Sequence, residues 1–394
     1  MPLKLLIVTD TFRNNCARGS DVFCTALIES LQRRHDVTVI TSGDSASPDI
    51  AATDGVIRLG PSSIADPDEL KRVLVEQLAG EDFDLLYNLS GMLFGNTIAS
   101  IFLEANSQLP LANHFQTMLG SYAGEEGYGQ ATVDFNQEGQ KESAEQAVLN
   151  VFLSQSEYRD ALLTGFEISR GLASVIPAGV RFADMRAVDP QDWLPARPKD
   201  VSRPTVFLTA GRFSDYIKGG DLIYRAFVHL YKKDPDVFLL VVSNSSRFAD
   251  LLKELPENAY RIIDWLPRSQ FLATIAGADV VVVPSRYESF GLTAVEAMML
   301  QKPVIANNVG GLQEIVYHGE TGILTDVREG SFGLYRALKQ LADNPSLRLA
   351  MGEAAARHAR REFDLDRVTD LVEKSLAAAV VRHRALASSA AFAC

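Results

Sequence analysis

The chain has 394 residues, 47% of them hydrophobic and 22% charged, which is long enough for two globular domains with separate cores. Its formal net charge of −12 is uneven: residues 1–200 hold 15 Lys and Arg against 28 Asp and Glu, and residues 201–394 hold 23 against 22. An acidic first half argues against nucleic acid and against docking on anionic lipid, because both require a basic surface. Acidity that only aids solubility stays open as the alternative to a role in substrate choice.

The apolar runs are too short to cross a bilayer, which takes about 20 residues, so no integral membrane contact is expected. The apolar start of the chain lacks a small-residue cleavage site and is expected to be a first strand rather than a signal peptide. The three cysteines, Cys16, Cys24 and Cys394, form neither a disulfide framework nor a zinc pattern, so a cytoplasmic location is expected.

Short β-branched runs alternate with helical stretches, a pattern typical of parallel sheets covered by helices. The expected strands, in chain order, are residues 3–9, 37–41, 56–59, 85–88, 111–114, 151–154, 206–210, 237–243, 261–264, 280–284 and 304–307. The predicted fold class is α/β, with two Rossmann-like doubly wound domains facing a cleft. Ligands in such sheets bind beyond the carboxyl ends of the strands, so loops of both domains should line that cleft.

The domain boundaries follow from composition. Residues 1–187 are assigned to a first, acceptor-binding domain, 188–204 to a linker with four prolines, and 205–377 to a donor-binding domain. A terminal helix at about 378–394 is expected to pack back on the first domain. The polar, glycine-containing stretch 119–145 is interpreted as an irregular loop, either a lid that contacts the acceptor or an excursion without a role.

A strand, a loop and a helix that begins near Phe290 or Gly291 form the densest signal. The first turn of that helix offers unpaired amides and a dipole that favour an anion, and Gly291 would let the backbone approach a phosphate. Glu288 and Glu296 fit best if each binds hydroxyl groups, one on a donor sugar and the other on a ribose. A solvated loop with incidental glutamates is the alternative interpretation.

Two further loops follow expected strands. Gly211 and Arg212 end one strand and Lys218 follows, so a guanidinium fork and an ammonium could clamp a diphosphate and stabilise its departure without a metal; a solvated surface loop is the alternative. Gly310 and Gly311 lie after another expected strand and before the next helix, where an anion or hydroxyl site and a tight turn are both open. The Asp-x-Asp pairs of the chain do not follow strand ends that face the expected cleft, so neither a metal nor a cofactor is expected.

In this order and spacing the three loops resemble the retaining glycosyltransferases of family 4, which have the GT-B fold and a glycosyltransferase group 1 type C-terminal domain. The family pattern Glu-x-Phe-Gly, with a second Glu after seven intervening residues, is matched at Glu288, Phe290, Gly291 and Glu296. The resemblance implies that Arg212 and Lys218 bind the donor diphosphate, Glu288 the donor sugar and Glu296 the ribose. The further donor-binding residues that it implies are Gly211, Phe290, Gly291 and Leu292.

The first half matches more loosely. His114 ends a strand where the family commonly places a histidine near the reacting sugar, so it is a catalytic candidate, with a structural role as the alternative. Gly19 and Ser20 stand where the family has paired glycines and are assigned to donor binding, although an acceptor contact stays open; Asp21 is expected to cap the next helix. Ala178 stands where an Asn usually precedes the glycine.

The resemblance implies transfer of a sugar from a nucleoside diphosphate sugar to a hydroxyl group with retention of anomeric configuration. It also implies front-face attack and closure of the domains over the donor. The acidic first half favours a small soluble acceptor, and a cationic one such as an amino sugar or aminocyclitol over an anionic lipid. A nucleotide-sugar epimerase or phosphorylase of the same fold, or a non-catalytic nucleotide-sugar binding protein, are the alternatives. The nucleobase and the oligomeric state cannot be read from the residues.

Overall fold

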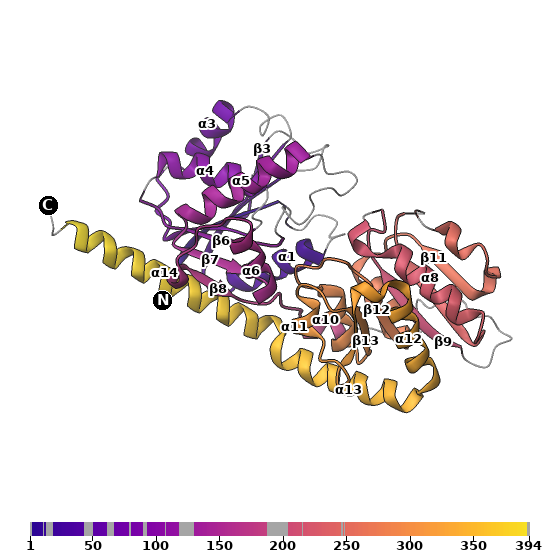
Figure 1. The fold of residues 1–394 in the computed structure, drawn as a ribbon. Coiled ribbons are helices and arrows are strands. Elements are labelled where there is room, and N and C mark those ends of the chain that lie inside the picture. The colour runs from indigo at the N-terminus through magenta and orange to yellow at the C-terminus, as the bar shows by residue number, and fades with distance from the viewer. Residues whose placement is uncertain are drawn as a thin grey trace. The chain divides into compact units, whose positions relative to one another are not determined.

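The computed structural model describes residues 2–10, 12, 19–42, 50–60, 67–78, 80–89, 93–106, 108–117, 130–186, 204–214, 216–245, 247 and 249–391. These residues form two compact units, each with its own sheet and helices (Figure 1). The first unit holds the described chain up to Gly179 together with Leu365 onward, and the second holds the chain from Val180 to Asp364.

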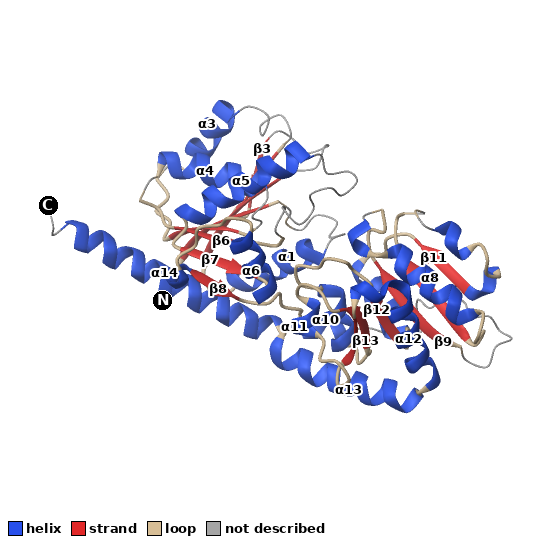
Figure 2. Ribbon diagram, in the orientation of Figure 1, coloured by secondary structure: helices blue, strands red, loops and turns tan. Residues whose placement is uncertain are grey.

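The first unit is built on an eight-stranded sheet in the order β3-β4-β2-β1-β5-β6-β7-β8, in which β3 is antiparallel to β4 and the other described pairings are parallel. Its strands are β1 (Lys4–Thr9), β2 (Asp36–Ser42), β3 (Ile50–Thr53), β4 (Val56–Leu59), β5 (Leu85–Asn88), β6 (Leu111–His114), β7 (Leu149–Phe152) and β8 (Ala173–Val175). Strand β1 lies in the middle, where Leu5 pairs with Val37 on one side and Leu85 on the other. Its apolar side chains are buried because helices cover the sheet (Figure 2).

The helices of this unit before its last helix are α1 (Gly19–Gln32), α3 (Pro67–Gln77), α4 (Leu93–Ala105), α5 (Gln130–Gln146) and α6 (Gln155–Leu163). The start of α6 has a local cause, since the Ser154 hydroxyl accepts the Glu157 amide at 3.0 Å. The Glu157 carboxylate in turn accepts the Leu153 amide at 2.7 Å. This reciprocal capping fixes where the chain turns from β7 into the helix.

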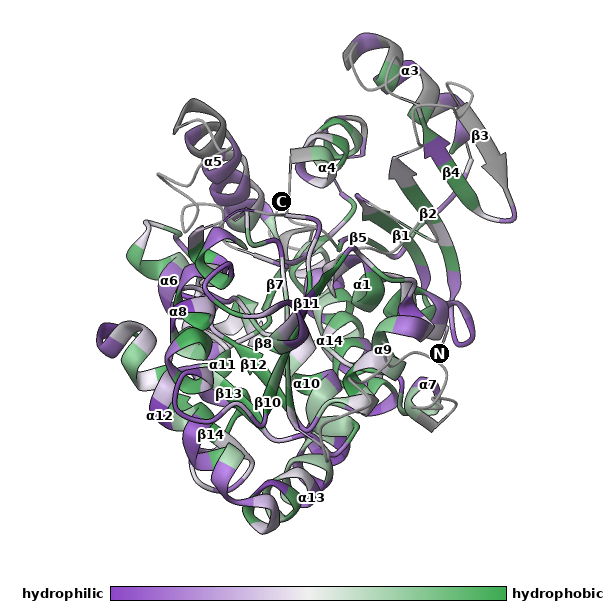
Figure 3. Cartoon of the chain, turned by 90° about the vertical axis from the view of Figure 1, so that its right-hand side faces the viewer, coloured by the Kyte–Doolittle hydropathy of each residue, from purple (hydrophilic) through white to green (hydrophobic). Residues whose placement is uncertain are grey.

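Helix α5 corrects the expectation of an irregular loop over residues 119–145, because residues 130–145 are helical; residues 118–129 lie outside the described part of the chain. Its apolar periodicity is weak because its buried side chains include Asn136, Gln140 and Ser143, and Figure 3 shows much of the helix in purple. The Gln140 amide donates to the Thr117 carbonyl at 3.0 Å, and the Ser143 hydroxyl donates to the Asn113 side-chain oxygen at 2.9 Å. Hydrogen bonds to β6 and to the segment that follows it therefore stand in for part of the hydrophobic contact that sequence patterns detect.

The second unit contains a six-stranded parallel sheet in the order β11-β10-β9-β12-β13-β14, and its central strands are strongly hydrophobic (Figure 3). The strands are β9 (Thr205–Ala210), β10 (Val237–Val242), β11 (Tyr260–Ile263), β12 (Val280–Val283), β13 (Val304–Asn307) and β14 (Gly322–Thr325). The helices are α7 (Phe182–Arg186), α8 (Gly220–Tyr231), α9 (Arg268–Gly277), α10 (Leu292–Met299), α11 (Leu312–Ile315), α12 (Gly330–Asp343) and α13 (Pro345–Glu362). Buried side chains of β9, β10, β12, α8 and α12 form one core, which fixes the loops at the carboxyl edge of the sheet.

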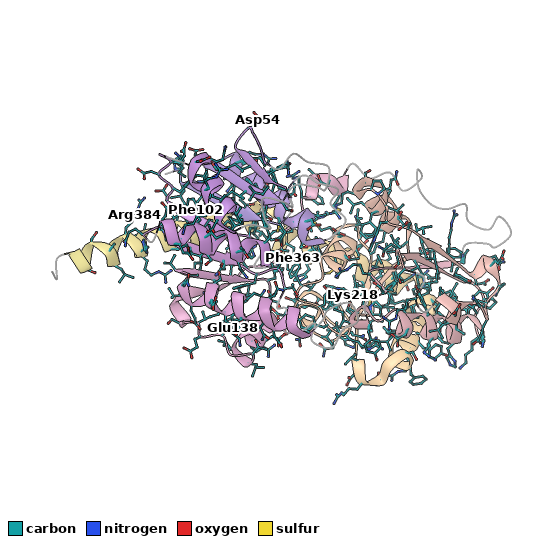
Figure 4. All side chains as sticks on the ribbon, turned by 90° about the horizontal axis from the view of Figure 1, so that it is seen from above. Asp54, Phe102, Glu138, Lys218, Phe363 and Arg384 are labelled. Atoms are coloured by element: carbon teal, nitrogen blue, oxygen red, sulfur yellow. The ribbon has the colours of Figure 1, made fainter. Side chains whose placement is uncertain are left out.

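The last helix, α14 (Leu365–Ala391), belongs to the first unit over its described length. Arg34, in the turn after α1, pairs with Asp370 at 2.5 Å and with Glu373 at 2.9 Å. Further along α14, Arg384, labelled in Figure 4, pairs with Asp84. The helix starts at residue 365, so residues 365–377, which the sequence assigns to the donor-binding domain, lie in the first unit instead. Of the expected linker 188–204, only residue 204 is described.

The second unit begins and ends at neighbouring points of the chain. The Val180 amide donates to the Phe363 carbonyl at 2.8 Å, and Val180 forms a parallel bridge with Asp364. Gly179 and Leu365, the residues of the first unit that flank this junction, also lie close together. A Cβ on Gly179 would lie 2.9 Å from the Leu365 Cα, so glycine is required at position 179. Among the described helices, none is long and apolar enough to cross a membrane.

Candidate functional site

The three loops singled out by the sequence follow β9, β12 and β13, which are adjacent in the sheet of the second unit. Because the three strands are parallel, their loops lie at one edge. The structure therefore brings Arg212, Lys218, Glu288 and Glu296 to the same side of one unit.

The loop after β9 is fixed at both ends. The Gly211 amide donates to the Val242 carbonyl at 3.1 Å, and the Phe213 ring is buried beneath the loop. Arg212 stands between them and is half-buried. Lys218 is the last residue of a 3₁₀ turn, Tyr216–Lys218, that leads into α8.

An ion pair joins this turn to the loop after β12. Lys218 Nζ lies 3.0 Å from Glu288 Oε2, and the Ser285 hydroxyl donates to the same oxygen at 3.1 Å. The two side chains retain 20% and 19% of their exposure, so solvent screens the pair only in part. The two residues were assigned to different parts of the donor, the diphosphate and the sugar, and the structure places them in contact.

Glycines allow the loops to approach this closely. Gly219 has a φ of +70°, and a Cβ there would lie 2.1 Å from the Pro284 carbonyl oxygen. Gly310 has a φ of +48°, and its Cβ would lie 1.9 Å from the Glu288 carbonyl oxygen, which accepts the Gly311 amide at 2.9 Å. The glycine pair after β13 therefore forms a tight turn that supports the Glu288 loop.

Helix α10 begins directly after this loop, with Gly291 at its N-cap and Leu292 as its first residue. Its first amides and its dipole favour an anion beside the Lys218–Glu288 pair. The Phe290 ring is buried and lies edge-on to Phe363 with centroids 5.7 Å apart. The Phe290 ring therefore packs in the interior at the start of α10, and the expected donor contact of this residue stays a prediction.

Glu296, in the second turn of α10, is 2% exposed and its carboxylate is paired with Arg268 at the start of α9. Burial raises the pKa of Glu296, and the Arg268 guanidinium opposes that rise. The arginine therefore favours the ionised carboxylate, which accepts hydrogen bonds from hydroxyl groups.

Two arginines of this site, Arg268 and Arg286, were missed from the sequence. Arg268 follows a proline at a helix start, and Arg286 stands in the best-matched loop two residues before the pattern begins at Glu288. Arg286 forms a two-pronged ion pair with Asp221 of α8, at 2.8 and 2.7 Å. Neither residue type nor spacing signals such pairs, because the partners lie 28 and 65 residues away.

The remaining candidates, His114, Gly19 and Ser20, lie in the first unit, whereas Arg212, Lys218, Glu288 and Glu296 lie in the second. His114 is fully buried: its Nδ1 is 2.6 Å from the Tyr87 hydroxyl, and its Nε2 has no hydrogen-bond partner in the described part of the chain. Burial lowers the pKa of His114 to about 3, so the imidazole is neutral at pH 7. Gly19 and Ser20 are the first residues of α1, which places Asp21 in its first turn and corrects the expectation that Asp21 is the N-cap.

Comparison with known proteins identifies the second unit most clearly. Residues 194–358 match the family Glycosyl transferases group 1. D-inositol 3-phosphate glycosyltransferase of Corynebacterium aurimucosum is 39% identical over 161 residues, which are 38% of this chain and 38% of that protein. The chain thus aligns with well under two thirds of that relative's length.

Two solved structures share the fold over nearly the whole chain. Sucrose-phosphate synthase of Thermosynechococcus elongatus superposes with a TM-score of 0.74 at 21% identity, covering 98% of this chain and all of that one. Anabaena HepE in complex with UDP-glucose superposes with a TM-score of 0.72 at 19% identity, covering 95% of this chain and all of that one. These likenesses confirm the predicted fold of two Rossmann-like units.

Proposed function

We infer the activity from one premise, that residues 194–358 match the family Glycosyl transferases group 1 within a chain of GT-B fold. We propose that the chain is a retaining glycosyltransferase that moves a sugar from a nucleoside diphosphate sugar to a hydroxyl acceptor. The observation that carries the proposal is the Lys218–Glu288 pair beside the start of α10, with Arg212 on the neighbouring loop and Glu296 in the next turn.

The chemistry of the site supports a charged leaving group. As the bond from the anomeric carbon to the phosphate oxygen breaks, negative charge develops on the diphosphate. Arg212, Lys218 and the first amides of α10 would stabilise that charge, so the proposed transfer requires no metal. Glu288 would accept hydrogen bonds from the donor sugar and Glu296 from the ribose.

Retention of configuration follows from the family mechanism proposed for this site. The acceptor hydroxyl attacks the face that the phosphate leaves, and the departing phosphate takes the proton of the acceptor. No side chain needs to act as a nucleophile in that step. His114, if it contacts the substrate, would do so as a neutral imidazole.

We propose a uridine diphosphate sugar as the first donor to test, since HepE was solved with UDP-glucose. The acceptor named for the Corynebacterium relative is D-inositol 3-phosphate, which is a phosphorylated and therefore anionic cyclitol. The acidic first half favours a soluble and cationic acceptor, so aminocyclitols and cyclitols form the first acceptor panel.

Donor binding is tested by thermal shift with UDP, GDP, ADP and TDP and their sugars, because a ligand that binds the folded state raises its stability. For the nucleotide that binds, Lys218→Ala should weaken the affinity by about tenfold to a hundredfold, since it removes a charged hydrogen-bond donor. Lys339→Ala, which removes an exposed lysine paired with Asp343 on α12, is the matched control.

Product analysis then separates the activities. A transferase should release nucleoside diphosphate and form a glycosylated acceptor, whereas an epimerase would alter the donor without an acceptor and a phosphorylase would consume inorganic phosphate. Unchanged affinity in both Lys218→Ala and Arg212→Ala would refute the proposed diphosphate site.

A further inference from the structure

Arg286 connects the two loops that carry Lys218 and Glu288. Its backbone amide donates to the Ile217 carbonyl at 2.6 Å, and its guanidinium donates to the Tyr216 carbonyl at 2.8 Å. Both acceptors belong to the short turn that ends in Lys218. One residue of the β12 loop therefore holds the backbone of this turn at two successive positions.

The guanidinium is itself held on two sides. Its Cζ lies over the Tyr216 ring, 3.7 Å from the ring centroid, and its two terminal nitrogens donate to the two oxygens of Asp221. The Arg286 and Asp221 side chains are only 18% and 17% exposed, so the pair is screened less than a surface ion pair. A stacked and bidentate arginine has a fixed orientation that a lysine cannot reproduce.

The position of Arg286 relates these contacts to the ion pair. Glu288 follows it by two residues on one loop, and Lys218 follows Tyr216 by two residues on the other. Gly219, the residue after Lys218, packs on the carbonyl of Pro284, which lies two residues before Arg286, without room for a side chain. Lys218 and Glu288 thus each lie within two residues of the contacts through which Arg286 joins the two loops.

We propose that Arg286, with Asp221 and Tyr216, is a positioning residue that sets Lys218 against Glu288 for donor binding. This inference rests on the proposed function for its effect on the donor. It assigns Arg286 no contact with the donor: the arginine acts through the geometry of the turn. Preorganised charges bind a diphosphate better than mobile ones, because less ordering accompanies binding.

The first test needs no substrate. Amine-reactive labelling of the full chain, read by mass spectrometry, reports how well the Lys218 ammonium is held. In Arg286→Ala and Arg286→Lys the labelling rate of Lys218 should rise about fivefold, while that of Lys339 stays constant. The matched control is Arg336→Ala, because Arg336 on α12 also pairs with a carboxylate, that of Glu329, and also lies over an aromatic ring, that of Phe332. Equal labelling of Lys218 in the parent and both Arg286 variants would overturn the inference, whether or not a donor binds.

The second test measures affinity for UDP-glucose in a double-mutant cycle. With Lys218 present, Arg286→Ala should weaken UDP-glucose binding by about tenfold. In the Lys218→Ala background the same substitution should weaken it by less than twofold, because the lysine that Arg286 positions is absent. Arg286→Lys should recover less than half of this loss of affinity. Thermal melting should show that both Arg286 variants are folded at the temperature of the binding assay. The same loss in both backgrounds would contradict the inference and indicate either a direct donor contact or a general structural role. If the parent binds no nucleotide sugar, the proposed function fails, and the labelling result still decides the role of Arg286.

Discussion

Lowering the pH should reduce the free energy of unfolding of the first unit, because His114 is buried there as a neutral imidazole. The imidazole is fully buried at the end of β6, and its pKa in the folded chain is about 3, against 6.5 for an unperturbed histidine. Between these two values the unfolded chain binds a proton at this residue that the folded chain does not. Stability from His114 is therefore fully present above pH 6.5 and is lost as the pH falls from 6.5 towards 3.

The magnitude follows from the two pKa values. From pH 7 to pH 5, the loss attributable to His114 is about 2 kcal/mol, because each pH unit below the unfolded pKa costs about 1.4 kcal/mol. His114→Asn removes the titrating ring and keeps a side-chain oxygen near the position of Nδ1, where it can accept the Tyr87 hydroxyl. The variant should therefore lose about 2 kcal/mol less stability than the parent over this pH range.

The assay should report on the first unit alone. Hydrogen–deuterium exchange of the β6 amides, corrected for the intrinsic effect of pH on exchange, gives the opening free energy of the strand itself. His229→Asn, on α8 of the second unit, is the control and should leave β6 unaffected. If the parent and His114→Asn lose the same opening free energy between pH 7 and pH 5, the burial argument for His114 is wrong.

Two further changes test the donor site. Gly219→Ala should destabilise the second unit by about 3 kcal/mol in denaturant unfolding and weaken UDP binding, because the added carbon would meet the Pro284 oxygen in a left-handed backbone conformation. Gly80→Ala, at a similar φ but in open space, should cost only about 1 kcal/mol; equal losses would show that the close approach carries no energy. Arg268→Ala should move the acidic limb of UDP affinity to higher pH, because the pKa of buried Glu296 rises further when its cation is removed. Calorimetric titrations at several pH values check this shift, and an unmoved acidic limb would count against the pairing.

The sequence predicts most of the parallel strands, because each is a short apolar run followed by a polar loop. It misses β3, β8 and β14, which have three or four residues each, and it places β7 two residues too late. Helix α5 is missed for a different reason. Its buried side chains include the polar Gln140 and Ser143, so the sequence shows no apolar helical period there. Hydrophobic periodicity detects a helix that buries apolar side chains, and it does not detect one whose buried side chains are polar and hydrogen-bonded.

The donor loops could be predicted in part. The pattern around Glu288 and Glu296 locates the helix start to within a residue, because Gly291 is required there by its backbone conformation. The partners Arg268 and Arg286 could not be found, since each is defined by a contact with a distant helix. The roles assigned to Arg212, Lys218, Glu288 and Glu296 stay predictions until donor binding is measured.

The neighbouring ends of the second unit have a consequence for how such proteins diversify. Because the chain enters at Val180 and leaves at Asp364, joined there by a hydrogen bond and a bridge, residues 180–364 form one uninterrupted cassette. Exchange of this cassette would replace all the residues assigned to the donor loops in a single genetic event, while Gly179 and Leu365 stay with the recipient fold. A gene encoding this architecture would thus change Arg212, Lys218, Glu288 and Glu296 together and keep the part of the protein in which His114, Gly19 and Ser20 lie.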